Sequence, residues 1–257
     1  MNILVCVKRV PATGGRIVLT PDATDIDVRY LSFTVSPHEE CAVEEAVRIV
    51  EAHGGSTAVL TLGPAAAEDQ LREAMAIGIE RAILLETDGR DWDPVATAGA
   101  IVDAIREQEA DNGPFDLILF GNESADSGGF QVGIRTAAAL GRPCVTGVKK
   151  LQSGDGSVVA RREAQSGGWE SFELPLPAVV TVKEGINLPR YPSVPGRLRA
   201  RKKDVERSTP PWRSGGLEKI GLRLPKEEVT AAEVIGHGAE AAPAVVDLLE
   251  RIGVLDR

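Results

Sequence analysis

The chain has 257 residues, of which 43% are hydrophobic and 26% charged, the composition of a globular protein able to bury a sizeable core. Its formal net charge of −9 argues against nucleic acid as a general partner. The three cysteines lie far apart and the three histidines are equally scattered, so neither a disulfide framework nor a His-rich metal site is expected.

The N-terminal apolar run is too short for a signal peptide, and no run approaches the ~18 apolar residues that span a bilayer. We therefore expect a cytoplasmic protein with no direct membrane insertion. Each cysteine falls in an apolar segment, where a small buried hydrophobic side chain is the expected role.

Short apolar runs alternate with amphipathic segments along residues 1–148. The predicted strands are Ile3–Val7, Thr57–Leu62, Ala82–Leu85 and Phe115–Phe120. The predicted helices are a first helix beginning at Ser36, then Ala66–Ile77, Pro94–Gln108 and Gln131–Leu140. This alternation predicts an α/β fold with a doubly wound, mostly parallel sheet that helices cover on both faces.

The first helix has the clearest start signal in the chain. Ser36 is placed to cap it, Pro37 falls at its first position, and Glu39 completes an S-x-x-E capping box. Glu39 and Glu40 also suit the positive end of the helix dipole. These carboxylates therefore have structural roles of their own.

The pattern changes after Val148. Ser157–Glu163 and Trp169–Leu174 read as two strands joined by a glycine-containing turn, and Ala178–Val182 reads as a third, which predicts an antiparallel annex to the sheet. The turn sequence 166–171, SGGWES, is superficially similar to the pyrophosphate loop of ATP pyrophosphatases. That loop joins a strand to a helix, so its position between two strands favours a hairpin turn.

Residues 208–219 are rich in Pro, Ser and Gly and read as a linker. We expect an α/β domain over residues 1–207 and a C-terminal arm over 208–257. A last helix, Ala242–Arg251, lies in this arm.

The polar loop that begins Gly121-Asn122-Glu123 follows a buried strand and precedes a helix. Open α/β sheets bind ligands at the carboxyl ends of their strands, and N–H groups at a helix start favour phosphate. The loop is neither a Walker A motif nor GxGxxG. It is interpreted as a nucleotide phosphate loop, with a plain connecting loop as the alternative.

No arrangement of side chains points to ordinary catalysis. Asp126, Glu123 and the Glu39-Glu40 pair have no second carboxylate at a fixed separation, and there is no nucleophile elbow or zinc motif. The sequence therefore does not read as that of an ordinary catalyst.

Positive charge gathers after residue 196 in this acidic chain, including Arg197, Arg199 and Arg207. Three prolines stiffen the preceding residues and disfavour helix there, with the apolar Val194 at the tip. The basic run is either a docking surface for an acidic partner or a solvated segment.

Four ordered motifs resemble the beta subunits of electron transfer flavoproteins along nearly the whole chain. They are LPAVVTV-x-x-x-x-N-x-PRY with its basic run (176–203), the helix start SP…AVEEA (36–46), the end of the first strand VKRVP (7–11), and the loop 121–133 ending QVG. The resemblance implies a doubly wound, nucleotide-binding fold of the adenine nucleotide alpha hydrolase type. It also implies a heterodimer with an alpha subunit that holds most of the FAD site.

The family's beta subunit holds AMP, or a second FAD in electron-bifurcating relatives. AMP is favoured here. FAD stays as the alternative, because Gln131-Val132-Gly133 also appears in the FAD-binding relatives. By resemblance, the nucleotide contacts are Cys6, Ser36, Pro37, His38, Glu39, Leu62, Gly121, Asn122, Glu123, Ser124, Ala125, Asp126, Ser127, Gly128, Gly129, Phe130, Gln131 and Val132.

The resemblance also places Val194 at the tip of a recognition loop, residues 187–203, that anchors partner dehydrogenases. Pro195, Arg197 and Arg199 flank that tip, and Glu163 falls on a glutamate that tunes conformation in the family. The tip is usually Leu, so Val keeps a shorter apolar anchor.

Three departures from the family pattern concern the nucleotide site. The usual Gly-Lys-Gln start of the loop is Gly121-Asn122-Glu123 here, so phosphate affinity must come mainly from backbone N–H groups. His38 replaces an aromatic residue near the flavin, and Ser-Gly-Gly follows Asp126 where the family has an acidic stretch.

The function implied is electron transfer from flavin-dependent dehydrogenases to a quinone oxidoreductase or another acceptor. The alternative is a stand-alone adenine-nucleotide-binding regulator or ATP-using ligase on the same type of sheet, which would be a stable monomer that turns over nucleotide.

Overall fold

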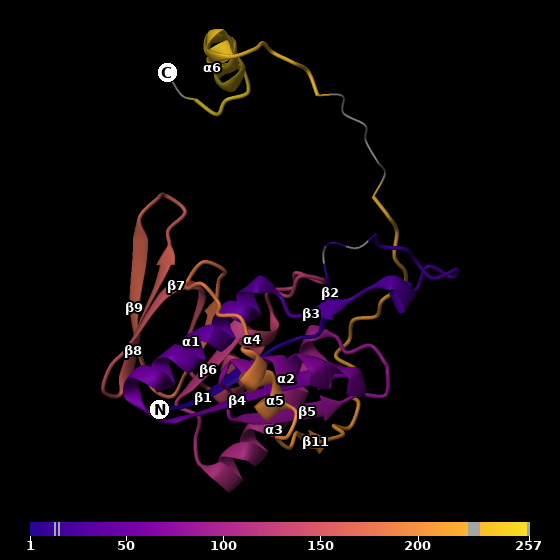
Figure 1. The fold of residues 1–257 in the computed structure, drawn as a ribbon, viewed down its shortest axis with the longest axis vertical. Helices are drawn as coiled ribbons and strands as arrows, with labels where there is room; N and C mark the ends of the chain where they lie inside the picture. Colours follow the sequence, from indigo (N-terminus) through magenta and orange to yellow (C-terminus); the bar gives the residue numbers. More distant parts are fainter. Residues whose placement is uncertain (13, 15, 226–231, 256–257) are drawn as a thin grey trace. The chain divides into compact units, whose positions relative to one another are not determined.

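The computed structural model describes residues 1–12, 14, 16–225 and 232–255. Contacts divide the chain into two compact units, Met1–Gly221 and Leu222–Arg257. The first unit contains a nine-stranded sheet flanked by helices, and Figure 1 shows its layers.

The large sheet has the strand order β11-β5-β4-β1-β6-β10-β7-β8-β9. Its strands are β1 (Asn2–Cys6), β4 (Ser56–Gly63), β5 (Arg81–Glu86), β6 (Leu117–Gly121), β7 (Cys144–Ser153), β8 (Ser157–Glu163), β9 (Trp169–Pro175), β10 (Ala178–Val182) and β11 (Glu206–Ser208). A separate two-stranded antiparallel sheet pairs β2 (Val10–Pro11) with β3 (Phe33–Thr34).

The helices of the first unit are α1 (Pro37–His53), α2 (Glu68–Ile77), α3 (Pro94–Asn112), α4 (Val132–Leu140) and α5 (Val194–Ala200). Short 3₁₀ turns are η1 (Val28–Tyr30) and η2 (Ala65–Ala67). The second unit contains η3 (Ala239–Ala241) and α6 (Ala242–Arg251), so the last helix has the bounds that the sequence predicts.

Alternation of side chains along each strand builds two core layers. Ile3 and Val5 of β1 pack in the layer that also holds apolar residues of α1 and α2. Leu4 and Cys6 face the other way, into the layer that contains residues of α3 and α4. Both faces of the parallel strands are thus buried, as expected for a doubly wound sheet.

The antiparallel annex is confirmed for the strands β8 and β9. It is wrong for Ala178–Val182, because this strand (β10) lies between β6 and β7 and runs parallel to both. β7 runs parallel to β10 and then pairs with β8 in antiparallel fashion, and β8 pairs with β9. The strand β7 was not predicted, because its lysines and the irregular register near Val148 obscure the strand pattern. The SGG sequence forms the β8–β9 turn, where Ala164 N donates to Gly168 O at 3.1 Å, so the hairpin interpretation is confirmed.

Two helix predictions are corrected. The helix expected from Ala66 begins as the 3₁₀ turn η2 and becomes α-helical at Glu68. The prolines of the basic region do not exclude helix, because Ser193 caps α5 and Pro195 sits in its first turn, where a missing N–H costs nothing.

The order of the strands creates a switch point beside β1. The chain adds β4 and then β5 on one side of β1, and then returns to add β6 on the other side. At such a point the carboxyl ends of two neighbouring strands lead to connections on opposite faces, which leaves a crevice suited to a ligand. The connection that follows β6 therefore starts at the edge where a nucleotide is expected.

Candidate functional site

Predicted site residues from three strands meet at the carboxyl edge of the sheet. Cys6 at the end of β1 stands in register with Leu60 of β4 and Phe120 of β6. Leu62 and Gly121 come one or two residues later on those strands, so both lie at the same edge. Burial, with a smaller effect from the charge of Glu39, raises the pKa of the Cys6 thiol well above its ordinary value. Cys6 is therefore a neutral packing residue rather than a nucleophile.

The β6–α4 loop (residues 121–132) is folded back on itself. Gly128 N donates to Ser124 O at 3.0 Å, and the hydroxyls of Ser124 and Ser127 lie 2.8 Å apart. Gly128 and Phe130 both have φ of 53°, a left-handed conformation that is common for glycine and rare for phenylalanine. The loop thus has a defined turn geometry rather than an extended course.

Three side chains, one from the residues just after β1 and two from the start of α1, reach across to this loop. Lys8 Nζ contacts the two carboxylate oxygens of Asp126 at 2.6 and 2.9 Å. Ser36 Oγ donates to Glu123 O at 3.1 Å, and His38 Nε2 lies 3.3 Å from Glu123 Oε1. These contacts join the first strand, the start of α1 and the loop into one site.

Lys8 was not among the predicted site residues, although it lies two residues after β1 at the switch point. Burial raises the pKa of Asp126, but the Lys8 charge and hydrogen bonds outweigh this and lower it below its ordinary value. The site therefore keeps a charged ion pair beside the loop.

Glu39 is the buried centre of this arrangement. Its carboxylate accepts from Ser36 N and from Lys8 N, both at 2.9 Å, and Ser36 Oγ accepts from Glu39 N, so the capping box is confirmed. Burial raises the pKa of Glu39 to about 8 against the opposing effect of these hydrogen bonds. The side chain is buried and joins the start of α1 to the backbone at Lys8.

Gly121 has no room for a side chain. A Cβ added there would lie 2.6 Å from Glu39 Cγ and 3.1 Å from Glu39 N. The end of β6 and the first turn of α1 therefore approach as closely as glycine allows, which is a steric requirement rather than one of flexibility.

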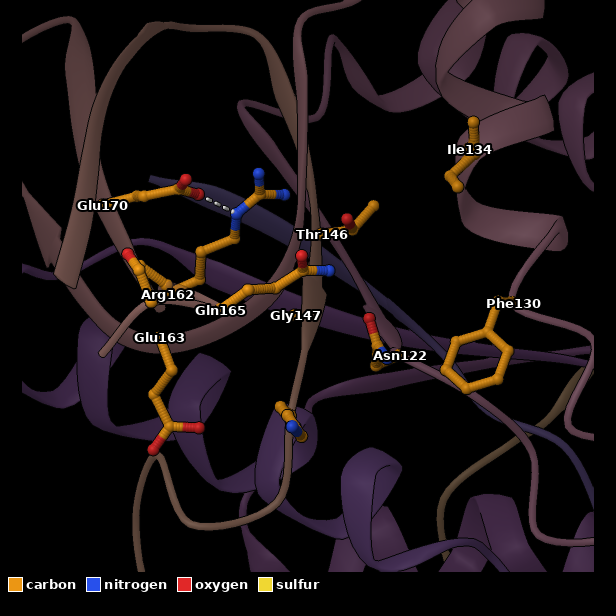
Figure 2. A pocket seen from close by; sticks show the side chains of 12 residues that line it. Asn122, Phe130, Ile134, Thr146, Gly147, Arg162, Glu163, Gln165 and Glu170 are labelled. Carbon is orange, nitrogen blue, oxygen red and sulfur yellow. Dashed lines mark hydrogen bonds and ion pairs between the residues drawn. The ribbon is translucent and has the colours of Figure 1, made fainter. Parts of the chain in front are cut away.

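Asn122 turns away from this centre. Its side-chain oxygen accepts from Thr181 Oγ1 at 2.8 Å, and its N–H donates to Val182 O at the same distance. It lines a cavity of about 760 Å³ between the loop and the β8–β9 hairpin, together with Phe130 and Glu163 (Figure 2). The same loop therefore borders this cavity and also starts at the carboxyl edge of the sheet, where Cys6 and Leu62 lie.

Glu163 lies at the end of β8 and pairs with Lys149 of β7 at 3.1 Å. Nearby, Arg162 pairs with Glu170 across the hairpin at 2.6 Å, the dashed contact in Figure 2. The predicted conformational residue therefore borders the cavity, apart from the residues around Glu39.

The segment 187–203 lies elsewhere, on α1 and α2. Val194 is the first residue of α5 and is exposed, as are Pro195, Arg197 and Arg199. Some of the basic residues are bound within the fold and do not face solvent. Lys203 Nζ donates to the carbonyls of Ile79 and Glu80 at 3.0 and 3.2 Å. Arg207, in the edge strand β11, pairs with Glu86 at 2.8 Å and with Glu68.

Within the described residues, no group of His, Cys, Asp and Glu side chains is arranged to hold a metal ion. In the same part of the chain, the helices are all too short or too polar to cross a membrane.

Comparison with known proteins gives one consistent result. The model of the electron transfer flavoprotein domain family matches residues 27–211. The chain is 34% identical to the electron transfer flavoprotein subunit beta of Bacillus subtilis, with 97% of each chain covered. It is 35% identical to the protein of that name from Thermoanaerobacterium thermosaccharolyticum, covering 90% of this chain and 87% of the other. It is 32% identical to the one from Mycobacterium tuberculosis strain H37Rv, covering 96% and 97%. The chain therefore belongs to the electron transfer flavoprotein beta subunit family.

Proposed function

We propose that this chain pairs with an alpha subunit to form a soluble electron carrier of the cytoplasm. The observation that supports this best is the β6–α4 loop, held at the switch point by Lys8, Ser36 and His38 in a chain of this family. The redox reaction belongs to FAD, which supplies the acceptance and release of electrons when it is bound, mainly by the alpha subunit. No catalytic side chain is proposed here.

The nucleotide proposed for this subunit is AMP, with a second FAD as the alternative. The close approach at Gly121 brings the end of β6 against the first turn of α1, so the loop begins beside the start of that helix. The loop leads directly into α4, whose N–H groups favour a phosphate, and Lys8 brings a positive charge alongside. Asp126 neutralises part of that charge, so we assign most of the phosphate affinity to backbone N–H groups.

Cys6, Ser36, Glu39 and Leu62 are proposed as nucleotide contacts, as the family resemblance implies, and each also has a role in the fold. Ser36 and Glu39 hold the start of α1 against the loop, while Cys6 and Leu62 pack at the strand ends. Glu163 is proposed to tune the conformation of the heterodimer from the edge of the cavity.

Electrons would come from flavin-dependent dehydrogenases and leave to a quinone oxidoreductase or another acceptor. We assign the docking of the dehydrogenase to segment 187–203, with Val194 as the apolar contact. Residues 208–257 are proposed to form an arm that contacts the alpha subunit, with residues 1–207 as the nucleotide-binding domain.

Co-expression with the alpha subunit tests the proposal against a stand-alone nucleotide-binding regulator or ligase. The account expects a yellow 1:1 complex that a flavin-dependent dehydrogenase reduces. A colourless monomer that hydrolyses ATP, with or without the alpha subunit present, would contradict it.

A further inference from the structure

The segment 187–203 is attached to α1 by a charged cluster that joins two distant motifs of the sequence. Arg190 and Glu44 lie 146 residues apart in the chain. Arg190 Nε contacts Glu44 Oε2 at 2.9 Å, and its terminal nitrogens contact the carboxylate of Glu51 at 2.7 and 2.8 Å. One guanidinium thus holds two carboxylates that lie about two turns apart on the same face of α1, the geometry that favours arginine over lysine.

Glu44 is nearly inaccessible, although it is a charged residue. Its carboxylate also accepts from Arg48 Nε at 2.7 Å and from the backbone N of Arg190 at 3.2 Å. Burial raises the pKa of Glu44, but these hydrogen bonds together lower it below its ordinary value. A buried carboxylate with this many donors is ionised and fixes the backbone at Arg190, not only its side chain.

A second polar contact stands one turn away at the start of the segment. Asn187 Nδ2 donates to Cys41 O at 3.0 Å and to Glu45 Oε2 at 2.8 Å. Glu44 and Glu45 are adjacent on α1, so this one helix turn holds Asn187 and Arg190. Both acidic residues of the AVEEA motif are thereby explained by the segment they hold.

The far end of the segment is fixed on α2. A Cβ at Gly196 would lie 2.4 Å from Ala76 O, so α5 approaches α2 as closely as glycine permits. Arg72 Nη1 donates to Ala200 O at 2.7 Å and to Lys203 O at 3.3 Å. The segment is therefore attached at both ends by side chains that lie behind it.

The residues between these attachments present an apolar surface. Leu188, Tyr191, Val194 and Leu198 expose 83%, 94%, 72% and 55% of their surface. Apolar side chains on a segment that is already ordered lose little further entropy when a partner binds. We infer that Arg190 and Glu44 are positioning residues, which hold these apolar side chains in place for an apolar face of a dehydrogenase; this rests on the docking role proposed above.

The test compares Arg190→Gln with Arg142→Gln in the full heterodimer. Arg142 is a matched control, because its Nη2 contacts both oxygens of Glu109 at 2.6 and 2.9 Å in a different part of the fold. In Arg190→Gln, backbone amides of residues 188–194 should exchange roughly 10-fold faster than in wild type, and those in Arg142→Gln should not change. Equal exchange of this segment in the two variants would overturn the inference.

The second readout is the rate at which a flavin-dependent dehydrogenase reduces the heterodimer. The dehydrogenase is taken from the same organism and is one whose rate saturates with the concentration of wild-type heterodimer. Arg190→Gln should raise the KM for the heterodimer roughly 5-fold at unchanged kcat, because only the docking geometry is lost. Arg190→Lys, which keeps the charge but not the double contact, should give an intermediate KM.

Val194→Ala, measured in the same assay, separates the two proposals. A raised KM in Val194→Ala with a wild-type KM in Arg190→Gln overturns the positioning inference and leaves docking intact. A wild-type KM in Val194→Ala overturns the docking assignment, and the positioning inference with it.

Discussion

Two neighbouring parallel strands, β6 and β10, each lead to a segment with a proposed function, and the two segments are built in opposite ways. The β6–α4 loop is surrounded by Lys8, Ser36 and His38, whose side chains converge on it. Segment 187–203 is held from behind by α1 and α2 and shows its apolar residues to solvent. Enclosure suits a small ligand, whereas attachment from one side suits a protein partner.

Helix α1 serves both segments with different carboxylates. Glu39 in its first turn is buried beside the loop and its pKa is raised to about 8. Glu44, little more than one turn later, meets Arg190 and has a lowered pKa. The contrast teaches that burial alone does not set the charge of a glutamate; the number of charged donors around it does.

Substitution at Gly121 should have the largest effect. In Gly121→Ala, the added Cβ meets the backbone and side chain of Glu39, so the loop and α1 must separate at a cost of roughly 1–3 kcal/mol. We expect loss of the beta-subunit nucleotide and a lower thermal midpoint in the purified heterodimer. Docking should survive, with a near-normal KM for the dehydrogenase.

The matched control is Gly99→Ala in α3, where an added Cβ meets no atom within 4 Å. Alanine in a helix should stabilise the protein by about 0.5–1 kcal/mol and leave the nucleotide bound. Equal nucleotide content in Gly121→Ala and Gly99→Ala would remove the steric argument for the site.

The pH dependence of stability should separate the two glutamates. The folded carboxyl of Glu39 keeps its proton up to a pKa of about 8, whereas an unfolded glutamate loses it near 4.5. The folded state therefore binds more protons between these values, and stability falls as pH rises from about 5 to 8. Glu39→Gln should reduce the dependence of the thermal midpoint on pH. It should also lower the free energy of unfolding by about 1–3 kcal/mol, because the NH₂ group of the glutamine would face a backbone N–H donor.

Glu44→Gln provides the comparison on the same helix. Because the pKa of Glu44 is lowered, its titration lies below this window, and the variant should keep the wild-type slope. If Glu39→Gln and Glu44→Gln show the same slope as wild type, Glu39 does not titrate in this range.

Shortening the exposed anchor should have a smaller effect. Val194→Ala removes two methyl groups from a contact made only with the partner, so the KM should rise roughly 5-fold with flavin and nucleotide content unchanged. Val95→Ala, an exposed valine at the start of α3, is the control and should behave as wild type.

The smallest effect is expected for the basic flank. Replacing Arg197 and Arg199 by Gln should slow association with the dehydrogenase roughly 3-fold at low salt and weaken its dependence on ionic strength. Stopped-flow reduction at several salt concentrations measures this. An unchanged dependence on salt would show that the two arginines take no part in docking.

Local sequence patterns predicted the helix start and the loop position of the candidate site. They did not predict contacts between residues that lie far apart in the sequence. Ser36 and Glu39 are three residues apart, so the capping box and the start of α1 could be recognised directly. The position of Gly121 followed from the alternation of strands and helices. The contact of Arg190 with Glu44 spans 146 residues and leaves no periodic pattern, and α5 was missed because prolines in a first turn resemble those that break helices.

The most direct test of the central claim is the identity of the nucleotides released when the purified heterodimer is denatured. The account predicts one AMP together with one FAD per heterodimer, with AMP lost and FAD kept in Gly121→Ala. Release of a single FAD and no second nucleotide from the wild-type heterodimer would contradict the assignment of the β6–α4 loop as a nucleotide site.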